Sequence, residues 1–134
     1  MEIVNFNFSN EPQVYLMKIR DQDHYKIGIS KNIQKRKKQL LGTSPFHLDV
    51  LDTIASKNAK FLENKIRSHF KEFTSAQEWI TLDPWGGSVL MVMFELYRLE
   101  YSGALNLHQP SAIFDGLVNE LRQLVKNHKY QTKP

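Results

Sequence analysis

The amino-acid sequence predicts an α/β protein of the mixed, α+β type, with a small, mainly antiparallel three-stranded sheet flanked by helices and a C-terminal helical pair. Two β-rich runs separated by a short polar break predict a hairpin near the N-terminus. A helical pattern follows the second run at once, and two longer helical patterns occupy the last third of the chain. The 134 residues suffice for one domain with an appendage.

The predicted hairpin covers residues 14–30. Residues 14–20 form an apolar run rich in β-branched and aromatic side chains, residues 21–23 are polar turn formers, and residues 24–30 form the second strand. Gly28 lies inside this second strand, where a glycine weakens the pairing. We therefore expect it to let another backbone or a ligand come close.

Helical and strand patterns alternate after the hairpin. Residues 32–41 predict a helix that is capped by Ser30 or Asn32, ends at Gly42 and turns Ile33 and Leu40 inward. Residues 46–55 alternate apolar and polar side chains, which predicts the third strand. Residues 57–73 predict a second helix, and residues 78–82 predict a short strand or extended segment.

From residue 84 onward the sequence shows only helical patterns. Asp83 followed by Pro84 predicts the cap and first position of another helix. We expect one domain over residues 1–83 and a helical extension over residues 84–134 that packs on it, with helical patterns at residues 89–99 and 111–127. This helical pair either covers the sheet or forms an interface between copies of the chain, as in a homo-oligomer.

Composition excludes several classes of protein. The chain has no cysteine, so it can form neither disulfides nor cysteine-based zinc sites. Hydrophobic residues make up 41% and charged residues 24%, which is typical of a globular chain. The N-terminus lacks the pattern of a signal peptide, and the longest apolar run is too short to span a membrane. We expect a cytoplasmic protein without a membrane partner.

The net charge is +4, and its placement matters more than its size. The eight residues 31–38, at the start of the first predicted helix, contain five cations and no acidic residue. The cations are Lys31, Lys35, Arg36, Lys37 and Lys38. The spacing of Lys31, Lys35 and Lys38 predicts an exposed basic ridge. A solvated helix face is the plain interpretation, but the absence of an acidic neighbour favours phosphate binding, and hence DNA as the partner.

The motifs and their spacing resemble the GIY-YIG nuclease superfamily, closest to the branch of phage and bacterial DNA-binding domains in which the second signature is Lys-Ile-Gly. The resemblance runs from about residue 14 to residue 82, roughly half of the chain. It rests on Val14-Tyr15, Lys26-Ile27-Gly28, Arg36, Leu62-Glu63 and Glu78-Trp79.

The resemblance implies roles for several side chains. Glu63 would be the ligand of Mg²⁺ or Mn²⁺, although an ion pair with Arg67, four residues along the helix, is the structural alternative. Arg36 would hold the scissile phosphate, and otherwise it is one more surface cation. Tyr15 would reach the attacking water or the phosphate, but its strand face also suits core packing.

Three positions depart from the better-known nucleases. Lys26 stands where those enzymes carry a tyrosine, and it would act either as a general base with a lowered pKa or as a phosphate anchor. Leu40 stands where many members have a histidine. Glu78 replaces a frequent asparagine and is a second candidate for metal binding, or it closes the fold beside Trp79.

The favoured hypothesis is a divalent-metal-dependent DNA endonuclease. The first alternative is a DNA-binding module of the same fold that does not cleave, and the second is a structural or oligomerising protein. The chain has no glycine-rich phosphate loop, which argues against nucleotide hydrolysis. Target sequence, strand preference and pathway do not follow from the sequence.

Overall fold

The structure is a computed structural model that describes residues 11–42, 46–102 and 110–132. The chain divides into two compact units, Met1–Thr81 and Leu82–Pro134. The first unit holds a four-stranded sheet with strand order β3-β1-β2-β4, in which every neighbouring pair is antiparallel. The α+β architecture is therefore confirmed, whereas the prediction of three strands is wrong.

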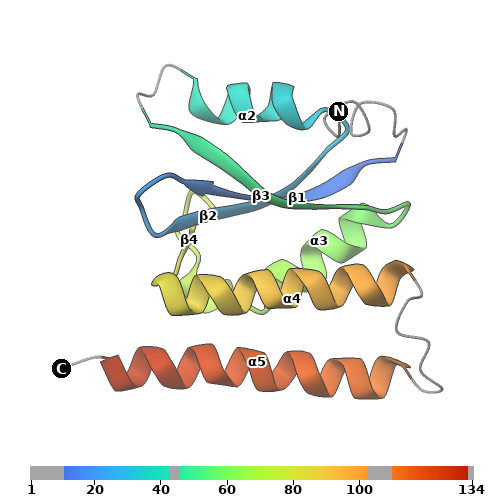
Figure 1. The fold of residues 1–134 in the computed structure, drawn as a ribbon, viewed down its shortest axis with the longest axis vertical. Helices are drawn as coiled ribbons and strands as arrows, with labels where there is room; N and C mark the ends of the chain where they lie inside the picture. The colour runs from blue at the N-terminus through green and yellow to red at the C-terminus, as the bar shows by residue number, and fades with distance from the viewer. Residues whose placement is uncertain (1–10, 43–45, 103–109, 133–134) are drawn as a thin grey trace. The chain divides into compact units, whose positions relative to one another are not determined.

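The predicted hairpin is confirmed as β1 (Gln13–Ile19) and β2 (His24–Ser30) (Figure 1). Asp21 in the turn has a φ of 66°, a left-handed conformation that aspartate tolerates better than most residues. β3 (Leu48–Ala55) pairs with the other edge of β1, with a bulge opposite Leu16 and Met17. β1 is thus a central strand, paired with β2 on one side and β3 on the other.

The fourth strand, β4 (Ile80–Thr81), pairs with β2 through Tyr25 and His24. It lies inside the segment that the sequence predicted as a strand or extended. A strand of two residues shows no alternation of side chains, so pairing with β2 and not a local pattern makes it a strand.

Two helices flank the sheet of the first unit (Figure 1). α2 (Ile33–Leu41) covers one face, where Tyr15, Met17, Ile33 and Leu48 form a buried cluster. α3 (Ala59–Ser68) lies against β1 and β2 and buries Leu62 and Ile66.

α3 is shorter than the predicted helix over residues 57–73. After Ser68 the backbone tightens: the amide of His69 donates to the carbonyl of Ile66, and that of Phe70 donates to Arg67. A 3-10 turn, η1 (Lys71–Phe73), follows. Bonds of this i to i+3 type are the usual way in which a helix end satisfies its last carbonyls.

The second unit consists of α4 (Pro84–Ser102) and α5 (Pro110–Thr132). Asp83 accepts a hydrogen bond from the amide of Gly86 at 2.8 Å, so the predicted cap is confirmed. Tyr97 and Phe114 pack edge to face with ring centroids 4.7 Å apart. No helix among the described residues has the length and apolar character needed to cross a membrane.

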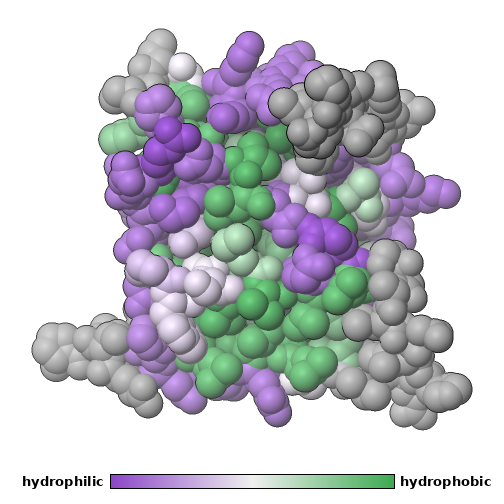
Figure 2. All heavy atoms as spheres, viewed as in Figure 1, coloured by the Kyte–Doolittle hydropathy of each residue, from purple (hydrophilic) through white to green (hydrophobic). Residues whose placement is uncertain are grey.

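Hydrophobic side chains gather on the visible surface over α4 and α5, whereas the surface over α2 is mainly hydrophilic (Figure 2). Among the described residues of this unit, the large apolar side chains that are exposed are Trp85, Met91, Val92, Leu117 and Leu124. Packing of the extension on the sheet and assembly of a homo-oligomer through these helices both stay predictions.

Candidate functional site

The β1–β2 register aligns three of the predicted site residues on one face of the sheet. Tyr15 lies directly opposite Gly28, and Lys26 lies opposite Met17, two residues along the strand. Residues that alternate along a strand share a face, so Tyr15, Lys26 and Gly28 lie on the face that α2 covers. Tyr25, next to Lys26 on the strand, is buried on the opposite face.

Gly28 does admit a close neighbour, but that neighbour is the ring of Tyr15. An ideal Cβ at Gly28 would stand 2.3 Å from the Tyr15 hydroxyl oxygen and 2.5 Å from Cζ. The expectation that a backbone or a ligand fills this space is therefore wrong. Tyr15 is 1% exposed, so the glycine lets a buried tyrosine lie across the sheet surface.

α2 brings Arg36 to the hydroxyl of Tyr15. Asn32 caps the helix by accepting a hydrogen bond from the amide of Lys35 at 3.0 Å, which confirms one of the two predicted caps. One turn later, Nε of Arg36 donates to the Tyr15 hydroxyl at 3.2 Å. The ring of Tyr15 therefore packs in the core, and its hydroxyl contacts Arg36; a role for this hydroxyl toward water or phosphate stays a prediction.

Lys26 reaches toward the segment that precedes β4. Its Nζ donates to the carbonyl oxygen of Gln77 at 3.2 Å and lies 5.4 Å from the centroid of the Trp79 ring. Burial lowers the pKa of Lys26. The carboxylate of Glu78 opposes this shift in pKa, and the positive charge of Arg36 adds to it.

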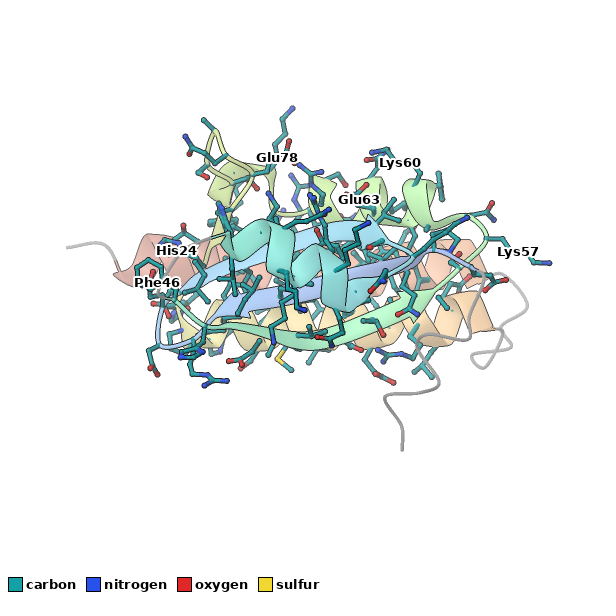
Figure 3. All side chains as sticks on the ribbon, turned by 90° about the horizontal axis from the view of Figure 1, so that it is seen from above. His24, Phe46, Lys57, Lys60, Glu63 and Glu78 are labelled. Atoms are coloured by element: carbon teal, nitrogen blue, oxygen red, sulfur yellow. The ribbon has the colours of Figure 1, made fainter. Side chains whose placement is uncertain are left out.

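Glu63 is a buried carboxylate on α3, with its side chain only 7% exposed. Oε1 accepts from Nζ of Lys60 at 3.2 Å, and Oε2 accepts from Nη1 of Arg67 at 3.5 Å. The structural alternative from the sequence, an ion pair with Arg67, is thus present. Figure 3 shows Lys60 and Glu63 together on α3, along the same edge of the sheet as Glu78.

Glu78 lies in a tight turn just before β4. The turn is closed by the amide of Ser75, which donates to the carbonyl of Trp79 at 2.8 Å, and Glu78 has a φ of 67°. Its carboxylate accepts from Nη2 of Arg67 at 2.7 Å. Arg67 therefore connects Glu63 on α3 with Glu78 on this turn.

These contacts bring several charged side chains near Lys26. The charged side chains that act on it are Glu78, Arg36, Arg67 and Glu63. The sequence suggested Arg67 only as a partner of Glu63, because four residues make one helical turn. Its bond to Glu78, eleven residues away, has no signal in the sequence, since it depends on how the turn folds back.

The predicted basic residues of α2 do not all lie on one surface. Lys31, Lys35 and Lys38 are exposed, as their spacing predicted. Lys37 is half-buried near Asp49 of β3, where its charge helps to lower the pKa of Asp49, although the hydrogen bond from Arg20 is the main cause. Lys37 therefore differs from Lys35 and Lys38 on the same helix and from Lys31 just before it.

The candidate site offers few ligands for a divalent cation. Among the described residues, no cluster of three or more histidine, aspartate or glutamate side chains could hold a metal. Mg²⁺ can be bound by one or two carboxylates while keeping several waters and substrate phosphates, so the oxygens of Glu63 fit in type. Both oxygens are already paired with cations, however, so the ion would have to displace one of them.

The fold and site define a small α+β domain with a Tyr–Arg pair, a buried glutamate and a basic helix. Residues 13–88 match the family model of the T5orf172 domain, and the chain belongs to this family. Comparison with curated proteins and with solved structures gave no match.

Proposed function

We propose that this domain is a DNA endonuclease of the GIY-YIG type that hydrolyses phosphodiester bonds with Mg²⁺ or Mn²⁺. The observation that carries the proposal is the convergence of Tyr15, Arg36 and Lys26 on one face of the sheet, with Glu63 in the same group of charges. These residues come from four separate elements. Membership of the T5orf172 family is consistent with a nuclease or DNA-binding role.

The chain's own groups would act on the phosphate in distinct ways. The guanidinium of Arg36 would bind the non-bridging oxygens and stabilise the negative charge that builds up as water attacks phosphorus. The Tyr15 hydroxyl accepts from Arg36, which leaves its own proton free to be donated to a phosphate oxygen or to the attacking water. The ammonium of Lys26 would anchor the phosphate as a cation.

Glu63 would hold the divalent ion, and Glu78 is the second candidate. When bound, such an ion acts as a Lewis acid that offsets charge on the phosphate. The exposed Lys35 and Lys38 on α2 and Lys31 just before it would contact flanking phosphates and so position the DNA.

The second candidate function is DNA binding without cleavage. The pairing of both Glu63 oxygens with cations favours it, because a carboxylate held by two cations needs no metal to balance its charge. The basic face of α2 would serve this function equally well.

Incubation of supercoiled plasmid with the protein and Mg²⁺ or Mn²⁺ tests the proposal. We expect nicked or linear product from wild type and none from Glu63→Ala. Asp49→Ala is the matched control, because Asp49 is also a carboxylate paired with an arginine, Arg20, but lies on β3 outside the group around Lys26. DNA binding by wild type without cleavage in either metal would favour the second candidate, and full activity of Glu63→Ala would show that Glu63 is misassigned.

A further inference from the structure

Arg67 lies between the carboxylates of Glu63 and Glu78, the two candidate ligands of a metal ion. Its Nη2 is 2.7 Å from Oε1 of Glu78, and its Nη1 is 3.5 Å from Oε2 of Glu63. The Arg67 side chain is 29% exposed, the Glu63 side chain 7% and the Glu78 side chain 55%. The guanidinium therefore makes its shorter bond to the exposed carboxylate and its longer one to the buried carboxylate.

The buried carboxylate, that of Glu63, is the one that most needs a neighbouring positive charge. A buried ionised carboxylate is costly unless a cation lies beside it, and Arg67 supplies that charge from a half-buried position. Lys60 also reaches Glu63, but its side chain is 75% exposed and keeps most of its hydration. Of the two cations paired with Glu63, Arg67 is thus the less exposed to water.

We propose that Arg67 is an internal counter-ion that competes with a divalent cation for Glu63, with Glu78 holding the guanidinium when it is displaced. This inference rests on the proposed function, because it concerns the same carboxylate. A divalent ion needs an oxygen of Glu63, and Arg67 is paired with one of the two, Oε2. Two cations cannot share that oxygen without strong repulsion.

The geometry favours Arg67 as the group that yields. At 3.5 Å its contact with Glu63 is at the long limit of a hydrogen bond, whereas 2.7 Å to Glu78 is typical of a charge-assisted bond. A small rotation of the guanidinium could break the first contact and keep the second. Glu78 would then act as a positioning residue for Arg67 and not as a metal ligand.

Titration of the full chain with Mn²⁺ alone, followed by electron paramagnetic resonance of the free ion, measures this competition without any cleavage reaction. We expect Arg67→Gln to bind Mn²⁺ more tightly than wild type, by about fivefold, the low end of the typical coupling between two bound groups. Arg67→Lys keeps one positive charge but cannot bridge both carboxylates, so its affinity should lie between the two. It also provides the test if Arg67→Gln does not fold.

Arg20→Gln is the matched control, because it removes an arginine from a carboxylate pair elsewhere in the same unit, Arg20–Asp49. Its affinity for Mn²⁺ should equal that of wild type. Lys60→Gln should tighten binding less than Arg67→Gln, because Lys60 is largely solvated.

Unchanged or weaker Mn²⁺ binding in Arg67→Gln would overturn this inference, as would the absence of Mn²⁺ binding in every variant. Cleavage by wild type together with unchanged affinity in Arg67→Gln would leave the proposed nuclease function standing. Tighter Mn²⁺ binding in Arg67→Gln without cleavage by any variant would support the inference while the nuclease function failed.

Discussion

The hydroxyl of Tyr15 lies 2.3 Å from the point where a Cβ of Gly28 would stand, so the two residues, which face each other across β1 and β2, are sterically coupled. The same hydroxyl accepts the hydrogen bond from Arg36. Any side chain at Gly28 must therefore move the Tyr15 ring and, with it, the partner of Arg36. This coupling links stability of the hairpin to the geometry of the candidate site.

Gly28→Ala should lower the free energy of unfolding by about 1–3 kcal/mol, the usual cost of overpacking a core. Urea denaturation followed by circular dichroism measures it. Gly116→Ala on α5 is the control, since its Cβ meets no atom within 4 Å and alanine should stabilise the helix by about 0.5–1 kcal/mol. Equal stability of Gly28→Ala and wild type would show that the Tyr15 ring does not occupy this space.

Arg36→Ala should leave the melting temperature nearly unchanged while slowing cleavage by about 10²–10³-fold, the usual cost of losing a charge-stabilising donor. Arg36 is half-buried, and its side chain donates to the Tyr15 hydroxyl and, at 3.5 Å, to Gln39. Gln39→Ala is the control and should cleave like wild type. If Arg36→Ala unfolds at a much lower temperature, Arg36 is a structural residue.

Lys26→Arg should keep much of the cleavage activity and Lys26→Met should not, because we expect Lys26 to anchor phosphate as a cation. Burial lowers the pKa of Lys26, so its charge should be lost below the usual pH of about 10.4. Single-turnover rates should then fall as the pH rises through this lowered pKa. A rate that rises with pH together with an inactive, folded Lys26→Arg that still binds DNA would identify a general base instead, because arginine does not lose its proton.

Replacing Lys31, Lys35 and Lys38 with glutamine should weaken DNA binding and flatten its dependence on salt. The slope of log affinity against log salt should fall by up to about 0.9 for each phosphate that the variant no longer binds. Fluorescence anisotropy at several salt concentrations measures this slope. A double variant of two exposed lysines outside α2, Lys57 and Lys71, is the control. An unchanged slope in the α2 variant would exclude this helix as the DNA face.

Asp83→Ala should lower the stability of the helical extension by about 0.5–2 kcal/mol, because alanine cannot cap α4. The hydrogen bond from the amide of Gly86 lowers the pKa of Asp83, and the bond from His128 at 2.7 Å adds to this effect. A carboxylate with a lowered pKa stabilises the folded state above its unfolded pKa of about 3.9, and loses this effect as the pH falls through the folded value.

Thermal melts of Asp83→Ala and wild type between pH 7 and pH 3 check that prediction. The difference in melting temperature should be constant near neutral pH and shrink in acid. Asp83→Asn should retain most of the cap, because asparagine accepts the same amide bond. A difference that grows in acid would contradict the assignment.

Local chemistry explains which elements the sequence predicted. The hairpin, α2 with its cap at Asn32 and its end at Gly42, and the start of α4 at Asp83 and Pro84 all depend on residues within a few positions of one another. Helical spacing likewise predicted that Ile33 and Leu40 turn inward, and the structure packs the partly buried Leu40 against the cluster that holds Tyr15 and Ile33. Such rules need no knowledge of how distant segments meet.

The sequence by itself thus determined the local elements and the exposure of the basic residues Lys31, Lys35 and Lys38, whereas the register between β1 and β2 placed Tyr15 and Lys26 on one face. Only the tertiary structure decided that β4 joins the sheet, that the Tyr15 ring covers Gly28 and that Arg67 bridges Glu63 and Glu78. Each of these contacts joins residues that are eleven or more positions apart, or depends on the register between strands. Their formation follows from the closure of loops and the packing of the whole unit, which a local pattern does not encode.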